Sequence, residues 1–131
     1  MKIALGQINP TVGDFSGNAA KIIDFSRRAQ TAGAGMILFP ELSVCGYPPR
    51  DLVERPSFVE RNRETAEKIA AQTRGIAVIC GLVTAAHSDA GKAAMNSAAL
   101  LMDGKIAFVQ SKMLLPTCLL YTSDAADDLT R

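Results

Sequence analysis

The chain has 131 residues, enough for one domain with a hydrophobic core, because a chain of this size buries about two-thirds of its unfolded surface. Its composition, 48% hydrophobic and 21% charged, excludes a disordered, collagen-like or disulfide-dense protein. The 14 Lys and Arg residues nearly balance the 13 Asp and Glu residues, giving a net charge of +1. No strong basic field is present to attract a polyanion, so we expect no binding to nucleic acid or to a membrane.

The cysteines and the N-terminus indicate the compartment. Cys45, Cys80 and Cys118 show no metal-binding spacing, and their odd number disfavours a disulfide framework. The apolar stretch that begins at Lys2 meets Asn9 and Pro10 too early for a signal peptide or a membrane span. These features predict a cytoplasmic protein.

The first third of the chain alternates strand and helix patterns. Residues 2–8 are a continuous apolar run, as in a strand that is covered on both faces. Residues 18–32 have helical apolar spacing, with Ser16 or Asn18 as the expected N-cap and with glycines ending the helix. Residues 36–39 form a second short apolar strand that ends at Pro40.

A loop over residues 42–56 separates this part from the rest, since adjacent prolines in GYPPR disfavour helix. A second helix is predicted from Ser57, with a capping box to Glu60, to about residue 73, with Arg63 and Glu67 paired on its exposed side. Residues 76–83, 94–102 and 106–110 read as strands, the last two joined by a tight turn at Asp103-Gly104. The whole pattern predicts a layered α/β domain with helices packed on a sheet.

The character of the sequence changes after residue 117. Residues 118–131, CLLYTSDAADDLTR, contain three Asp and one Arg and continue none of the preceding patterns. We therefore assign residues 1–117 to the domain and expect 118–131 to be a disordered or weakly helical tail that is not its native continuation.

Glu41 is the first candidate catalytic residue. It follows a strand at the carboxyl end, where open α/β sheets bind their ligands. Burial beside Phe39 and Pro40 would make its carboxylate a usable general base, whereas a solvated Glu at the start of a loop explains the same pattern equally well.

Lys112 also follows a predicted strand, where a cation either stabilises an oxyanion or simply pairs with a carboxylate. A base and such a cation would act together with a nucleophile, for which a thiol that attacks an amide carbon is the natural candidate. The cysteines of this chain are poor candidates for that role. Cys80 reads as a core residue. Cys45, four residues beyond Glu41, could be reached by that carboxylate, but a Glu so close would keep the thiol protonated unless a cation intervenes. His87 stands alone in a polar loop and is expected to be solvated, and no metal site is predicted.

Several segments carry a resemblance to a known family. The segments MKIALGQINPTVGDFSGN, ILFPELSVCGYPPRDLVERPSF, NSAALLMDGKI and SKMLLPT occur in the order and spacing of one kind of domain. This domain is the N-terminal amidase domain of bacterial glutamine-dependent NAD synthetases, which belongs to the nitrilase (carbon-nitrogen hydrolase) superfamily. The resemblance covers residues 1–117 and implies a partial α-β-β-α sandwich.

The resemblance also implies roles for single residues. The superfamily uses a Glu-Lys-Cys triad, of which Glu41 in FPEL is the implied general base and Lys112 in KMLLPT the implied oxyanion-stabilising cation. Tyr47 in GYPP is an implied wall of a glutamine pocket. The family's nucleophilic Cys lies well beyond the lysine, so none is assigned in this chain: Cys118 is only six positions past Lys112 and stands where the family usually has a Tyr.

The implied reaction is hydrolysis of glutamine through a Cys thioester, with the ammonia passed to a separate synthetase domain that uses ATP and Mg to amidate deamido-NAD. The complete enzyme would be a homo-oligomer. The 131 residues carry no implied cofactor of their own and are expected to be inactive alone.

Three other interpretations remain at this point. The chain could belong to another amidase or carbamoylase of the superfamily. It could be a non-catalytic dimerisation module, although half of a sandwich would expose an apolar face. A flavodoxin-like nucleotide-binding domain is disfavoured because the sequence has no phosphate-binding loop.

Overall fold

A computed structural model describes residues 1–86 and 93–112 of the chain. The proposed boundary at residue 117 and the tail that follows it lie outside these ranges. The elements in the described ranges are, in chain order, β1 (Ile3–Leu5), α1 (Phe15–Thr31), β2 (Met36–Leu38), the 3-10 helix η1 (Arg50–Glu54), α2 (Pro56–Gln72), β3 (Ala77–Ala86), β4 (Ala93–Met102) and β5 (Lys105–Lys112).

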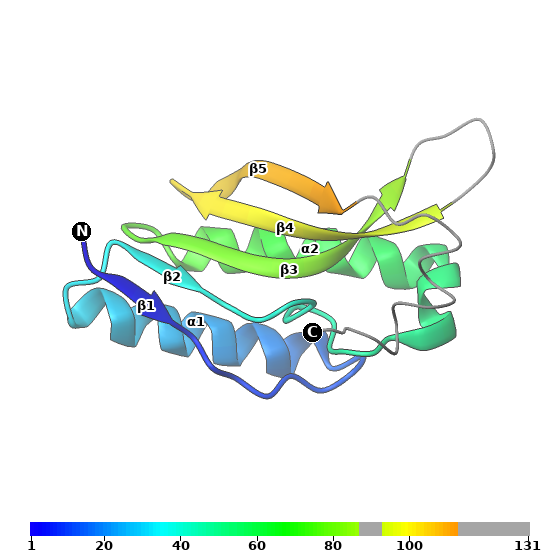
Figure 1. The fold of residues 1–131 in the computed structure, drawn as a ribbon, viewed down its shortest axis with the longest axis horizontal. Helices are drawn as coiled ribbons and strands as arrows, with labels where there is room; N and C mark the ends of the chain where they lie inside the picture. Colours follow the sequence, from blue (N-terminus) through cyan, green and yellow to red (C-terminus); the bar gives the residue numbers. More distant parts are fainter. Residues whose placement is uncertain (87–92, 113–131) are drawn as a thin grey trace.

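The strands form one mixed sheet in the order β1-β2-β3-β4-β5 (Figure 1). The pairs β1–β2 and β2–β3 are parallel, whereas β3–β4 and β4–β5 are antiparallel. The expected layered α/β fold is therefore confirmed. A flavodoxin-like domain is excluded, because its sheet is parallel with its first two strands exchanged in order.

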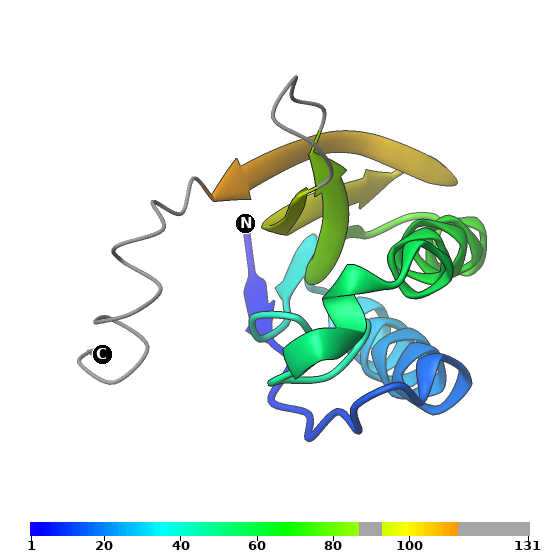
Figure 2. The ribbon, with the colours of Figure 1, turned by 90° about the vertical axis from the view of Figure 1, so that its right-hand side faces the viewer.

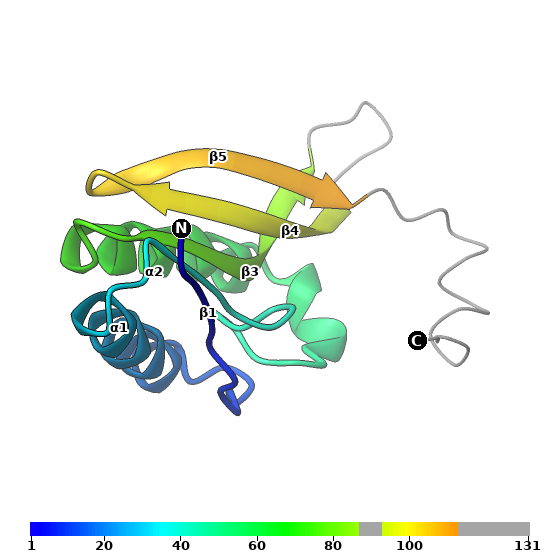
Figure 3. The same cartoon turned by 60° about the vertical axis from the view of Figure 1, so that its left-hand side comes forward.

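Both long helices lie on the same side of the sheet, as Figures 2 and 3 show from two directions. Between helices and sheet is the core, in which Ile22 and Ile69 from the helices and Ile37, Val78 and Leu101 from the strands are almost completely buried. Their burial supplies the main stabilisation of the layer pair. No helix in residues 1–86 and 93–112 is both long and apolar enough to span a membrane.

The other side of the sheet carries a row of apolar side chains, one from each strand. The five residues are cross-strand partners in register: Leu5, Leu38, Ile79, Leu100 and Phe108. Partners in adjacent strands point to the same face, so the row crosses the whole sheet. Leu5 is 70% exposed and Phe108 59% exposed. We call Leu5, Leu38, Ile79, Leu100 and Phe108 the apolar row. The described residues thus form one helix layer and one sheet of the expected sandwich.

Both helices begin differently from the sequence prediction. The N-cap of α1 is Asp14, whose Oδ1 accepts from the Gly17 amide at 3.0 Å, so Ser16 and Asn18 are not caps. Asn18 is fully buried and bonds the backbone of Thr11 and Val44. A buried amide with such partners holds two loops together, a role that short-range sequence patterns do not reveal.

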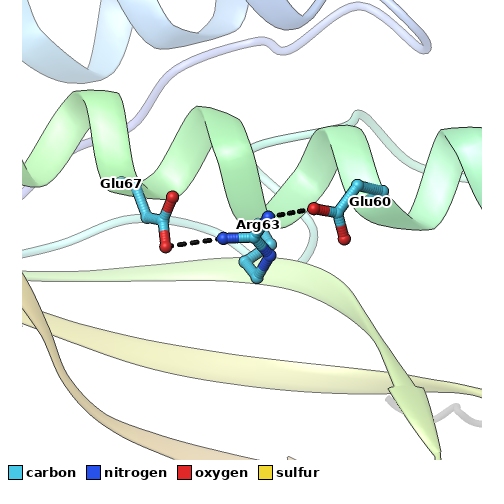
Figure 4. A network of polar contacts seen from close by, with 3 residues as sticks. All are labelled: Glu60, Arg63 and Glu67. Carbon is cyan, nitrogen blue, oxygen red and sulfur yellow. Dashed lines mark hydrogen bonds and ion pairs between the residues drawn. The ribbon is translucent and has the colours of Figure 1, made fainter.

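Helix α2 starts at Pro56, and its N-cap Arg55 makes no side-chain capping bond, so the capping box is wrong. Proline suits the first helical position because it has no N–H to leave unpaired. Glu60 instead pairs with Arg63, which also donates to Glu67 at 2.7 Å (Figure 4). The hydrogen bond from Arg63 lowers the pKa of Glu60. The three side chains are about half exposed, so the network contributes little to stability.

The hairpin of β4 and β5 turns at Asp103 and Gly104, whose φ angles are 55° and 82°, as the sequence predicts for a tight turn. A register shift follows between Leu100 and Leu101, where β5 accommodates an extra residue. Beyond it, Asn96 pairs with Lys112 rather than with Ser111. Because alternate residues point to opposite faces, this bulge decides which of the last two β5 side chains shares a face with Asn96.

The loop after β2 lies directly against β3. The Val44 amide donates to the Gly81 carbonyl at 3.0 Å, and the Gly81 amide donates to Ser43 Oγ at 3.2 Å. A Cβ at Gly81 would lie 2.2 Å from the Leu42 nitrogen. Leu42 itself has a φ of 51°, in the left-handed region that costs a branched side chain energy. The missing side chain at Gly81 thus allows the backbone at Leu42 to approach the sheet.

We predict that Gly81→Ala destabilises the chain by about 1–3 kcal/mol, the usual cost of forcing extra atoms into a packed site. The backbone at Leu42 cannot yield as a flexible side chain would, so the loop must shift. Urea unfolding followed by circular dichroism measures the loss.

Gly35→Ala is the matched control. A Cβ there would meet only the side chain of Met1, at 3.0 Å, and that side chain can move aside. Equal losses of unfolding free energy in the two variants would contradict the role given to Gly81.

The apolar row leads to a second prediction. We expect the 131-residue chain to self-associate as its concentration rises, because large exposed apolar surfaces drive association. Phe108→Ser should weaken this association. Val12→Ser is the control, because Val12 is 38% exposed but lies in a loop outside the sheet. Sedimentation velocity over a concentration series compares the self-association of the two variants. Equal self-association would refute the assignment of this contact to the apolar row.

Candidate active site

Glu41 lies just past the carboxyl end of β2, separated from the strand by Phe39 and Pro40. Its side chain and Pro40 are both exposed, so the expected burial of Glu41 beside Phe39 and Pro40 is not found in the described part of the chain. Glu41 differs in this from the residues that follow it, since residues 42–46 are all buried. The backbone of Glu41 nevertheless lies close to β3, since a Cβ on Gly81 would be 3.1 Å from the Glu41 Cα.

The carboxylate of Glu41 has a partner on a strand far away in sequence. Nδ2 of Asn96, in β4, donates to Oε2 of Glu41 at 2.8 Å. Asn96 is half-buried, and its side chain points away from the helices, to the same face as Leu100 four residues further along the strand. The Glu41 side chain is therefore tied to β4 as well as to its own loop.

Lys112 ends β5 and is the cross-strand partner of Asn96. Directly opposite residues of an antiparallel pair have Cβ atoms about 4.5–5.5 Å apart on one face. Asn96 thus contacts one candidate catalytic residue and is the nearest cross-strand neighbour of the other. The fold brings a carboxylate, an amide and an ammonium group to the same end of the same face.

The two cysteines of the described ranges do not take part in this cluster. Cys45 and Cys80 are fully buried and form no disulfide. Burial raises the pKa of the Cys45 thiol to about 11 and that of Cys80 to about 12. Both thiols are protonated at neutral pH, which makes them poor nucleophiles. For Cys45 the cause is burial and not the neighbouring Glu41 that the sequence analysis invoked. Cys118 and His87 lie outside the described residues.

Tyr47 lies in the same loop as Glu41 and is 59% exposed. The turn that carries it is held from both sides: the Gly46 amide donates to Leu42, and the Gly13 amide donates to Cys45. The site is thus built on a loop with a defined conformation.

Asn96 is the residue that the sequence analysis missed. It stands in the segment NSAALLMDGKI, which indicates a strand and its hairpin turn and carries part of the family resemblance, but from which no role for Asn96 was predicted. The available signal was a polar amide in a strand whose only other polar residue is Ser97, but its pairing with Lys112 depends on the β-bulge. Residues 1–86 and 93–112 contain no group of three His, Cys, Asp or Glu side chains placed to bind a metal ion.

Comparison with known proteins identifies the family. The model of the carbon-nitrogen hydrolase family matches residues 2–127. The glutamine-dependent NAD(+) synthetase of Thermotoga maritima is 42% identical over 118 residues, which are 88% of this chain and 20% of that protein. The chain therefore spans about one-fifth of the length of this relative.

Solved structures agree with this result. The glutamine-dependent NAD+ synthetase of Acinetobacter baumannii, determined with adenosine diphosphate, has a TM-score of 0.74 and 34% identity, over 87% of this chain and 21% of that one. An amidase from Nesterenkonia sp. has a TM-score of 0.69 and 26% identity, over 88% of this chain and 43% of that one. The fold and the matched family together show that this chain belongs to the carbon-nitrogen hydrolase family.

Proposed function

We propose that this chain is the N-terminal part of the glutaminase domain of a glutamine-dependent NAD synthetase. One observation carries the proposal: Glu41 and Lys112, 71 positions apart in sequence, lie around Asn96 at one end of one sheet face. A carboxylate base and an oxyanion-stabilising cation are what amide hydrolysis by a thiol needs. The 42% identity to the Thermotoga maritima synthetase supports glutamine as the amide.

The proposed chemistry has two steps. Glu41 takes the proton of a cysteine thiol, whose sulfur bonds to the amide carbon of glutamine while Lys112 stabilises the negative oxygen. The carbon-nitrogen bond then breaks, and the nitrogen leaves as ammonia with the proton from Glu41. In the second step Glu41 takes a proton from water, the hydroxide attacks the thioester, and the sulfur regains a proton as glutamate leaves.

The nucleophile is assigned to the remainder of the complete protein, which in this proposal also contains the synthetase domain that uses ATP and Mg with deamido-NAD. Two observations favour this assignment. Cys45 and Cys80 are buried with raised thiol pKa values, and the chain covers only 20% of the Thermotoga maritima relative. In the same proposal residues 118–131 are not part of the native domain, although the match to the family model runs on to residue 127.

Tyr47 is proposed as a wall of the glutamine pocket. It follows Glu41 by six positions in the loop that also holds the base, and its ring is available to a ligand because it is 59% exposed. The complete enzyme is proposed to be a homo-oligomer of the cytoplasm, a compartment that suits the unpaired Cys45 and Cys80.

A second candidate is an amidase that acts on other small amides. The Nesterenkonia amidase favours it, because a double mutant of that enzyme has been determined in complex with the small amide acrylamide. Its identity to this chain is 26%, against 42% for the Thermotoga maritima synthetase. Comparing glutamine with acrylamide and acetamide as substrates of the complete protein separates the two functions.

We predict that Glu41→Gln in the complete protein lowers kcat for ammonia release from glutamine about 10²-fold or more, as expected when a general base is lost. Gln keeps the size of the side chain but cannot take a proton. A coupled glutamate dehydrogenase assay measures the ammonia.

The controls are Cys45→Ala and Cys80→Ala, which should keep kcat within about threefold because a buried, protonated thiol does not attack the substrate. Loss of turnover on removing either thiol, at unchanged amounts of folded protein, would overturn the assignment of the nucleophile to another part of the enzyme.

We also expect the 131-residue chain by itself to release no ammonia from glutamine above the uncatalysed rate, since residues 1–86 and 93–112 offer a base and a cation but only buried, protonated thiols. Turnover by this chain that disappears in Glu41→Gln would contradict the prediction. The same assay, at high protein concentration, provides the measurement.

A further inference from the structure

The hydrogen bond between Asn96 and Glu41 joins residues 55 positions apart, and it anchors an otherwise exposed carboxylate. Glu41 belongs to a loop, whereas Asn96 lies within β4, between β3 and β5. A side chain on a paired central strand has a far better defined position than one on a loop. The strand therefore supplies the fixed end of this contact.

The orientation of the amide follows from its partner. An ionised carboxylate can only accept hydrogen bonds, so the Asn96 group that faces Glu41 at 2.8 Å must be the NH2. The carboxamide also carries an oxygen, which is the type of acceptor that the ammonium of its cross-strand partner Lys112 can use. Asn thus suits both neighbours, whereas Asp would repel the carboxylate and Ala would bind neither.

We propose that Asn96 is a positioning residue that fixes the Glu41 carboxylate for proton transfer by holding Oε2, so that Oε1 is the oxygen that accepts the proton. A hydrogen-bonded carboxylate oxygen has part of its negative charge already stabilised, which leaves the other oxygen as the more basic one. Asn96 acts through Glu41 and does not need to touch the substrate. This inference rests on the proposed function and adds a residue to it.

The kinetic test uses the complete protein with glutamine. Asn96→Ala should lower kcat about tenfold, in line with the loss of a hydrogen bond to a charged group, and leave KM within about twofold. Asn96→Asp has the same size but introduces a like charge beside Glu41. The acidic limb of the pH–rate profile of Asn96→Asp should move to higher pH, because the added negative charge favours the protonated form of the Glu41 carboxyl.

Gln110→Ala is the matched control. Gln110 is another amide on the same face of the hairpin, paired with Ala98, and its Nε2 donates to the backbone of Ser111. It should leave kcat, KM and the pH–rate profile unchanged. Asn96 variants with wild-type kcat and an unmoved acidic limb would overturn the proposal, as would equal effects in Gln110→Ala.

A second measurement separates this inference from the proposed function. In the ¹⁵N-labelled 131-residue chain, the side-chain NH2 signals of Asn96, assigned by their loss in Asn96→Asp, should shift as acid protonates Glu41. In Glu41→Gln this shift should disappear. NH2 signals that do not respond to acid would refute the contact. A wild-type enzyme without activity on glutamine, but with this NMR response, would refute the glutaminase function alone.

Discussion

The close contact between the backbone at Leu42 and Gly81 is the constraint on which the rest of the site depends. A Cβ on Gly81 would lie 2.2 Å from the Leu42 nitrogen, so only glycine lets the loop after β2 reach the sheet. Hydrogen bonds from Val44 and to Ser43 then hold it there. The positive φ of Leu42 shows that the loop accepts local strain for this position. Glu41, one residue earlier, is thereby brought within reach of β4.

A second constraint acts from the opposite side of the site. The bulge near Leu100 and Leu101 shifts the pairing of β5 by one residue, and with it every side chain up to the end of the strand. Without the shift, Ser111 would face Asn96, and Lys112 would point to the helix side. Ser111 instead lies on the helix side, where its hydroxyl bonds that of Ser97 at 2.9 Å. The bulge thus places the Lys112 ammonium on the face of the candidate site and the Ser111 hydroxyl on the helix side.

The sequence predicts the features that rest on local patterns. Apolar runs located all the strands, helical spacing located both long helices, and Asp103-Gly104 located the hairpin turn. The predicted helix starts were wrong because Ser57 and Asn18 are residue types that often cap helices but do not do so here. Helix α1 is capped by Asp14, and α2 begins at Pro56 without a side-chain cap. Asn96 was missed for a different reason. Its contact with Glu41 depends on a loop conformation and a bulge, and neither leaves a periodic signal in the sequence.

The candidate catalytic residues and the apolar row share one face of the sheet. Asn96 lies four residues from Leu100 on β4, and Lys112 lies four residues from Phe108 on β5, so a layer packed on the row would also cover the site. Such a layer would remove water from around the carboxylate and the ammonium, and their interactions with a developing charge strengthen as the local dielectric constant falls. Glu41 is exposed in the described part of the chain because this side of the sheet is uncovered there. Covering this surface would therefore bury the apolar row and the candidate site together, and the described residues leave both exposed on the same face.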